Sequence, residues 1–410
     1  MKQGKKILAL ALAVVMVFSL AGCSTSNSDN TSGSNTAEVT KAAEDTAVEA
    51  TTAPVQEVLE GKYPAETIKI GFVTFDTTAD QFISVKKYYE YLAETLNIEV
   101  MYSESIDSAE AELAFIESCA SAGCKAIVGY YNVARTESIQ LAIDKGMYYV
   151  GVAEEDEVYE AFKDNEYYLG GYYLGNGDYD LGYELGTSLA DSGCKSVVYV
   201  SGGRDFGIKM FIDRSEGFYA AIADAQANGS DIVIAYDVSG WPGTDSYSAD
   251  QAAALDMDID GVGCSFGAAT WLQPIENVGK TDTIKIASND VLSEMYASSF
   301  EAGSLVCLTV EMPGMFGLAV PLIINAVEGN NDNIRDNGAA PRVPMKRWVI
   351  KSADEFNAYY EIETTGIWTY NAADVLSVIK GYNPDASFES LCALYAANSI
   401  EEIEARRAAE

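Results

Sequence analysis

The chain has 410 residues, a formal net charge of -36 at pH 7 and no histidine. The missing imidazole excludes Ser-His-Asp and Cys-His catalysis and every zinc site that needs histidine ligands. The strongly negative charge makes nucleic acid and anionic lipid poor partners for most of the surface.

The first 22 residues have the layout of a secretory signal. Three lysines among the first six residues precede an apolar run from 7 to 17, which is too short to span a bilayer comfortably. Leu-Ala-Gly-Cys at 20–23 follows and resembles the lipobox of bacterial lipoproteins. The resemblance implies lipidation of Cys23 after cleavage and an anchor on the extracytoplasmic face of the cell membrane. An ordinary cleaved signal with an incidental cysteine is the alternative.

The composition of residues 23–66 predicts a disordered tether, because small, polar and acidic residues dominate and little apolar surface can be buried. Residues 67–410 are numerous enough for two lobes. Six further cysteines, at positions 119, 124, 194, 264, 307 and 392, stand mostly in apolar segments. We expect them to be small buried side chains, with one disulfide as the main alternative, and we expect no metal site.

Strand-like and helix-like patterns alternate from residue 68 onward. A β-like run begins at Ile68, and apolar residues at 82, 85, 89, 92 and 96 then follow at helical spacing. The alternation continues with strands at 98–102, 126–131 and 148–152 and helices over 109–123 and 136–145. This order predicts a parallel sheet with helices on both faces.

After a Tyr- and Gly-rich passage at 167–180, the alternation resumes. It predicts helices near 181–193 and 218–225 and strands at 196–200, 232–236, 261–265 and 283–288. Two successive doubly wound units fit this length better than one oversized sheet. The natural place for a ligand is then between them.

A third group of elements ends the chain. A strand at 305–310 precedes Pro313, which suits the first turn of a helix over 314–327. A short strand at 347–350 leads to Ser352-x-x-Glu355, a capping-box pattern. We expect two helices in the last 55 or so residues, and their role does not follow from the sequence.

The order of elements, the lipobox and three short stretches resemble the type I periplasmic binding proteins, specifically the solute-binding lipoproteins similar to ribose-, galactose- and xylose-binding proteins. The likeness covers about residues 67–350. RSEGF at 214–218 is similar to the family's Arg-x-x-Gly-Phe stretch, LTVEMPGMFG at 308–317 to a strand-to-helix crossover, and YLGNGDYDLG at 173–182 to the first crossover.

The resemblance implies an α/β fold of two Rossmann-like doubly wound lobes joined by three crossings. The N-terminal lobe would comprise 67–176 with 312–343, the C-terminal lobe 177–311 with 344–351, and an extension 352–410. The family binds a small polar ligand between the lobes, closes on it and delivers it to an ABC permease. It needs no cofactor and is not enzymatic, and we expect a monomer.

The same resemblance suggests ligand-binding residues. Arg214 would point its guanidinium at ligand oxygens, while Glu311 and Asp178 lie at crossings where polar residues of the family contact the ligand. Solvated hinge residues and, for Arg214, surface ion pairs are the alternatives.

Elsewhere the chain departs from the family pattern. TTADQF replaces Asn-Pro-Phe-Phe after the first strand and leaves Gln81 and Phe82 as candidates, although core packing explains Phe82 equally well. Glu154 stands near the place where many sugar binders have Asp-Arg, Phe266 begins the pair that replaces the family's Asn-Asp, and Asn289 replaces its later Asp. Ligand identity therefore does not carry over. A pentose or hexose is the first choice, with nucleosides and autoinducer-like sugars as alternatives.

An esterase and a ligand-presenting receptor are the rival functions. Gly263–Gly267 matches the Gly-x-Ser-x-Gly elbow of esterases, but the serine has no histidine to activate it, and GNG at 175–177 lacks the third glycine of a dinucleotide turn. A receptor that presents its ligand to a sensor kinase or chemoreceptor would have the same pocket as a transport protein. The sequence does not separate those two roles.

Overall fold

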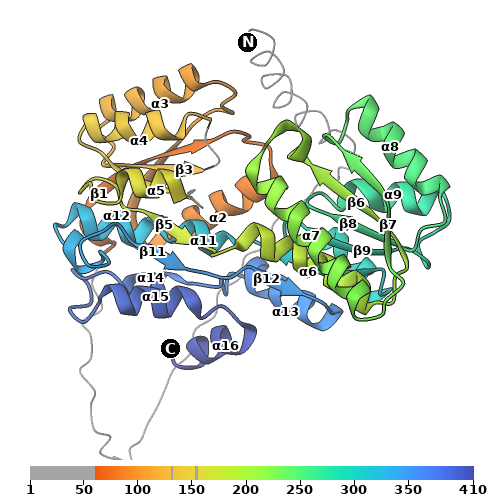
Figure 1. Ribbon diagram of the computed structural model, residues 1–410. Helices are drawn as coiled ribbons and strands as arrows, with labels where there is room; N and C mark the ends of the chain where they lie inside the picture. The colour runs from red at the N-terminus through yellow and green to blue at the C-terminus, as the bar shows by residue number, and fades with distance from the viewer. Residues whose placement is uncertain (1–60, 131–132, 153–155) are drawn as a thin grey trace, which may run out of the picture.

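The computed structural model describes residues 61–130, 133–152 and 156–410. It contains a four-stranded and a six-stranded sheet, each the centre of one lobe (Figure 1). The predicted signal, Cys23 and Glu154 lie outside the described residues. Among the described helices, none combines the length and the apolar character needed to cross a bilayer.

The four-stranded lobe is built on parallel strands in the order β2-β1-β3-β4. The strands are β1 (Tyr63–Thr74), β2 (Leu96–Tyr102), β3 (Ala126–Tyr130) and β4 (Tyr148–Gly151), and the helices are α2 (Asp80–Thr95), α3 (Ala109–Ser121), α4 (Arg135–Asp144) and α5 (Asp156–Phe162). Because side chains alternate along a strand, Phe72 packs with α2 on one face while Val73 packs with α3 and α4 on the other. The helical stripe predicted over 82–96 is the buried face of α2 as far as Leu92, whereas Leu96 begins β2. β1 starts at Tyr63, earlier than the tether prediction allows.

The six-stranded lobe has the order β12-β10-β9-β8-β6-β7, with only β12 antiparallel to its neighbour among these described strands. The strands are β6 (Ser196–Gly202), β7 (Val233–Ser239), β8 (Gly261–Cys264), β9 (Lys285–Asn289), β10 (Leu305–Val310) and β12 (Trp348–Ile350). Helices α6 (Gly177–Asp191) and α7 (Lys209–Ala227) cover one face, and α8 (Asp245–Asp256), α9 (Ala269–Asn277) and α10 (Ala297–Glu301) cover the other.

Two glycines bring α6 and α7 unusually close together. A Cβ on Gly217 would lie 1.9 Å from Tyr179 O, and a Cβ on Gly182 would lie 1.8 Å from Arg214 O. Only a residue without a side chain permits this approach. The glycine of the RSEGF stretch therefore has a packing role, and it places the start of α6 beside Arg214.

The chain passes between the lobes three times, as the resemblance implied. The first crossing follows β5 (Gly171–Tyr173), the second joins β10 to α11 (Pro313–Gly317), and the third joins β11 (Arg342–Pro344) to β12. Pro313 begins α11 as expected. The single helix predicted over 314–327 is instead split into α11 and α12 (Ala319–Val327), because Pro321 has no N–H to donate to the turn before it.

The extension forms four helices, so the expectation of two was wrong. They are α13 (Ala353–Thr364), α14 (Ala372–Ser377), α15 (Phe388–Ala396) and α16 (Ile400–Ala408). Short helices such as α14 and α16 show too few turns for a periodic pattern, and their starts depend on the caps Asn371 and Ser399. At α13, Ser352 caps as predicted, but Glu355 accepts from the N–H of Lys351, so the box is not reciprocal.

The six described cysteines are free; five are buried and Cys392 is half-buried. The prediction of small buried side chains is thus confirmed for five of them.

Candidate functional site

Asp178 and Arg214 form an ion pair at the start of α6. Nε and Nη2 of Arg214 each lie 2.9 Å from Asp178 Oδ1, and Nη1 donates to Ser265 O at 2.9 Å. Asp178 follows the first crossing, and Ser265 follows β8 in the six-stranded lobe. The guanidinium predicted to face a ligand therefore also fixes a carboxylate and a strand end.

Arg347 joins this pair to Glu311 and was not predicted as a site residue. Its Nη2 lies 2.6 Å from Glu311 Oε1 and 3.2 Å from Asp178 Oδ1, and its Nη1 donates to Gly177 O at 2.6 Å. Tyr172 of the four-stranded lobe donates to Glu311 Oε2 at 3.3 Å. Since Arg347 lies in the third crossing and Glu311 in the second, one guanidinium ties all three crossings together. The positional argument applied to Asp178 and Glu311 would have found Arg347 too.

We call Asp178, Arg214, Glu311 and Arg347 the ion network. Burial alone would raise the pKa of Asp178, but Arg214 and Arg347 hold it below its ordinary value. Burial would lower the pKa of Arg347, but Glu311 and Asp178 hold it above its ordinary value. Two arginines and two carboxylates give no net charge. The side chain of Asp178 is 29% exposed, against 9% or less for the other three, so Asp178 is where the network meets its surroundings.

An aromatic cluster adjoins Arg214 at the carboxyl ends of strands in the six-stranded lobe. It comprises Phe206, Phe211, Trp241 and Phe266. The Arg214 guanidinium lies 5.5 Å from the Phe211 ring. Among the described residues, Trp241 Nε1 and Ser265 Oγ are buried without a hydrogen-bond partner. Buried polar groups are rarely left unpaired, so a ligand or water is expected to meet them.

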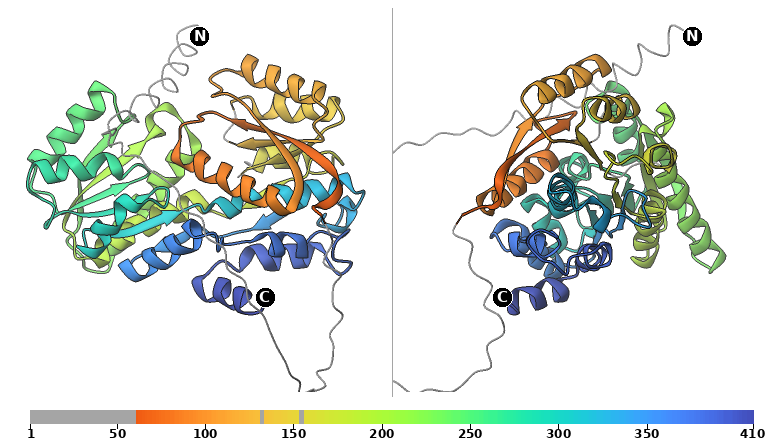
Figure 2. Two further views of the ribbon diagram at one scale, coloured as in Figure 1. Left: turned by 180° about the vertical axis from the view of Figure 1, so that it is seen from behind. Right: turned by 90° about the vertical axis from the view of Figure 1, so that its left-hand side faces the viewer.

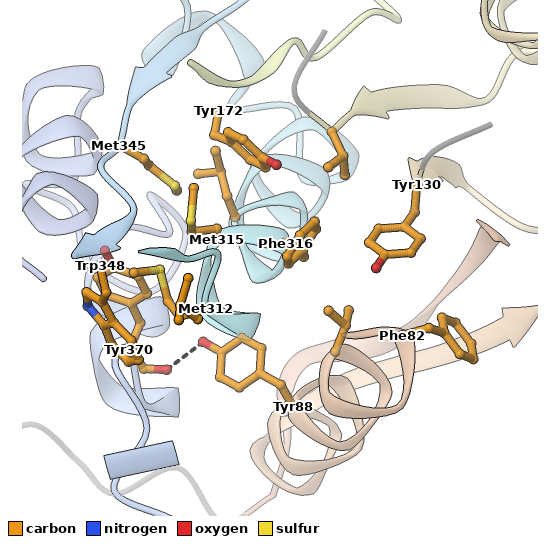
Figure 3. Close-up of a cluster of buried hydrophobic side chains, with 14 of the residues drawn as sticks. Phe82, Tyr88, Tyr130, Tyr172, Met312, Met315, Phe316, Met345, Trp348 and Tyr370 are labelled. Carbon is orange, nitrogen blue, oxygen red and sulfur yellow. Dashed lines mark hydrogen bonds between the residues drawn. The ribbon is translucent and has the colours of Figure 1, made fainter. Parts of the chain in front are cut away.

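Gln81 and Phe82 lie on α2 of the four-stranded lobe and are not members of the ion network. Phe82 is 3% exposed and packs against Phe72, Tyr102 and Tyr130, as the core alternative holds. Figure 3 shows Phe82 and Tyr130 in the same cluster of buried side chains. Gln81 accepts a hydrogen bond of 2.8 Å from the Tyr130 hydroxyl at the end of β3. Of Gln81 and Phe82, only Gln81 therefore places a polar group at the carboxyl end of a strand.

Asn289 ends β9, and its Oδ1 accepts from Thr309 Oγ1 at 2.9 Å. The next residue, Asp290, accepts from the Tyr296 hydroxyl at 2.5 Å. Burial raises the pKa of Asp290, and the negative charge of Asp80 adds to the rise. Asp80 begins α2 of the four-stranded lobe.

The structure therefore brings Asp178, Arg214 and Glu311 into one network and sets Phe266 in the adjoining aromatic cluster. Of the remaining described candidates, Asn289 ends β9, Gln81 in α2 bonds the end of β3, and Phe82 lies in the core. A separate cavity of about 290 Å³ in the four-stranded lobe includes Asp164, Glu166 and Asp332. Its Arg335 is already bonded to backbone carbonyls, and the described residues hold no cluster of three ligands suited to a metal ion.

No protein-family model matches the sequence, and no curated protein does. Solved structures do match the fold. The periplasmic solute binding protein of an ABC transporter from Actinobacillus succinogenes 130z, with bound D-allose, is 18% identical with a TM-score of 0.57, and the match covers 72% of this chain and 100% of that one. The arabinose-transporter binding protein from Shewanella sp. ANA-3, bound to L-arabinofuranose, is 17% identical with a TM-score of 0.55. The match covers 72% of this chain and 96% of that one. The XylFII–LytSN complex is 19% identical with a TM-score of 0.53, and the match covers 70% of this chain and 99% of that one. The chain thus has the two-lobe fold of the type I periplasmic binding proteins.

Proposed function

We propose that the protein is an extracytoplasmic solute-binding lipoprotein that holds an uncharged monosaccharide between its lobes and delivers it to an ABC permease. The carrying observation is the ion network, in which residues from all three crossings and from helix α7 converge. The allose and arabinofuranose bound by the two similar proteins support a sugar.

The chemistry of the site fits hydroxyl groups. A carboxylate such as Asp178 accepts hydrogen bonds from them, and a guanidinium such as Arg214 donates to them. The aromatic cluster offers flat apolar surface for the C–H face of a sugar ring. Trp241 Nε1 and Ser265 Oγ would gain the partners that they lack. Because the network is already neutral, a charged ligand would find no uncompensated counter-charge in it.

A thermal-shift screen tests this proposal. Residues 24–410 would be heated with pentoses, hexoses, nucleosides, amino acids and polyols. A ligand at one hundred times its Kd stabilises the folded state by about 2.7 kcal/mol, which is enough to raise the melting temperature measurably. We expect one or a few neutral sugars to do so. A response to nucleosides alone would refute the sugar assignment.

The lipid anchor and the transport role need separate tests. Cys23→Ala should release the protein from the membrane fraction into the medium or periplasm, whereas unchanged retention would contradict lipidation. A strain that lacks the protein should lose uptake of the labelled sugar.

A ligand-presenting receptor is the second candidate, because the similar XylFII was solved in complex with LytSN. If the strain keeps uptake but loses a sugar-induced transcriptional response, the receptor role is correct instead.

A further inference from the structure

The extension contacts both lobes. Phe356 of α13 lies 5.2 Å from Phe300 of the six-stranded lobe, measured between ring centroids. Trp368, after α13, lies 5.1 Å from Tyr88 and 5.4 Å from Tyr91 of α2 in the four-stranded lobe. Figures 1 and 2 show the same arrangement, with α13 under the six-stranded lobe and α14 and α15 under the other. The extension therefore lies across the side on which the crossings run.

The segment that follows α13, residues 368–372, is held in place by its contacts. Trp368 has a φ of 55°, a left-handed conformation that is costly for a bulky residue and persists only where contacts impose it. The Tyr88 hydroxyl donates to Tyr370 O at 2.5 Å, close to Met312 of the second crossing and Trp348 (Figure 3). The Ala372 N–H donates to the Tyr91 hydroxyl at 3.1 Å. Such contacts hold the extension in one position against the crossings.

Asn398 of the extension holds the third crossing on both sides of Arg347. Its side-chain Nδ2 donates to Lys346 O at 2.7 Å, and its backbone carbonyl accepts from Trp348 Nε1 at 2.8 Å. Asn398 is 7% exposed. Successive side chains of an extended chain point to opposite sides, so the backbone that turns Trp348 toward Asn398 turns Arg347 toward the ion network.

We propose that Asn398 is a positioning residue for the ligand site, acting through Arg347. With Asn398 in place, the backbone of the third crossing is held in the position from which Arg347 contacts Gly177 O, Asp178 and Glu311 together. Without the Asn398 side chain, Lys346 O loses its partner, Arg347 shifts from this common position and the two carboxylates lose their orientation. The reference to a ligand rests on the proposed function, whereas the effect on the crossings does not.

Hydrogen exchange tests the inference without a ligand. Residues 24–410 would be compared as wild type, Asn398→Ala and the control Asn325→Ala. Asn325 is buried and bonds Val378 O and the Lys380 N–H, so it also holds the extension, but on α12 and away from Arg347. We expect Asn398→Ala to speed amide exchange at 174–180 and 309–313, which Asn398 does not touch, and Asn325→Ala to leave those segments unchanged. Faster exchange confined to 345–349 and the extension would overturn the proposal, as would equal effects of both variants.

A double-mutant cycle is the second test. It measures the Kd of the neutral sugar that the thermal-shift screen selects. Asn398→Ala should weaken Kd about five- to tenfold, the scale of one lost hydrogen bond, while Asn325→Ala changes it by less than about twofold. In an Arg347→Met background, Asn398→Ala should add nothing further, because its effect passes through Arg347. If Asn398→Ala weakens Kd as much in that background as in the wild type, Asn398 does not act through Arg347. If no sugar binds the wild type, the proposed function fails, and the exchange comparison still decides the positioning role.

Discussion

Arg347→Met is the sharpest test of the ion network. Methionine keeps much of the apolar stem and removes the charge, so Glu311 and Asp178 lose their shared partner. Three acceptors are affected: Glu311 Oε1 at 2.6 Å, Asp178 Oδ1 at 3.2 Å and Gly177 O at 2.6 Å. Glu311 is 7% exposed and cannot recover full hydration. Removing one partner of a buried ion pair costs about 3–5 kcal/mol, a large share of an ordinary folding free energy.

Urea unfolding followed by tryptophan fluorescence measures this loss. Arg342→Met is the matched control, because Arg342 is on nearby β11 and pairs with Asp156, whose side chain is 77% exposed. Such a pair contributes about 1 kcal/mol or less, and the stacking of Arg342 on the Tyr159 and Tyr173 rings contributes about another 1 kcal/mol. The double variant Arg347→Met/Glu311→Gln should recover most of the loss, since no buried carboxylate is then left unpaired. If Arg347→Met costs no more than Arg342→Met, or if the double variant is no better than the single one, the network is not the paired structure described.

Three further predictions follow from single residues. Arg214→Ala should weaken sugar binding at least about tenfold by calorimetry, since it removes charge-assisted hydrogen bonds; an unchanged Kd removes Arg214 from the site. Gly217→Ala places a Cβ 1.9 Å from Tyr179 O, so we expect α6 and α7 to separate and the melting temperature to fall, and an unaltered melt contradicts the packing role. Burial raises the pKa of Glu363 from 4.5 to about 7, which favours its neutral form in the folded state. Stability should therefore fall as the pH rises through that interval, and Glu363→Gln should abolish this slope in melting curves.

The two sheets could be predicted because their elements carry local periods. The apolar stripe on α2 and the alternation of buried residues in β1 depend only on residues that are close in the sequence. Their predicted bounds therefore agree with the structure to within a few positions. α8 was missed because only Tyr247, Ala254 and Leu255 are buried along it, which leaves no clear stripe. β5 and β11 have three residues each and exist through pairing with one another. Elements of that length have no pattern of their own to read.

The members of the ion network could be predicted in part, and for a different reason. Asp178, Arg214 and Glu311 were found from short stretches that resemble a known family, whereas their mutual contacts depend on three chain crossings that meet only in the folded protein. Arg347 and Asn398 lie outside those stretches. The bulk charge of -36 also says little about the ligand, because the acids at the centre are matched one for one by arginines. A ligand's charge is selected by the few groups that it touches. In the proposed site those groups are balanced, so an acidic surface and a neutral ligand are compatible in one molecule.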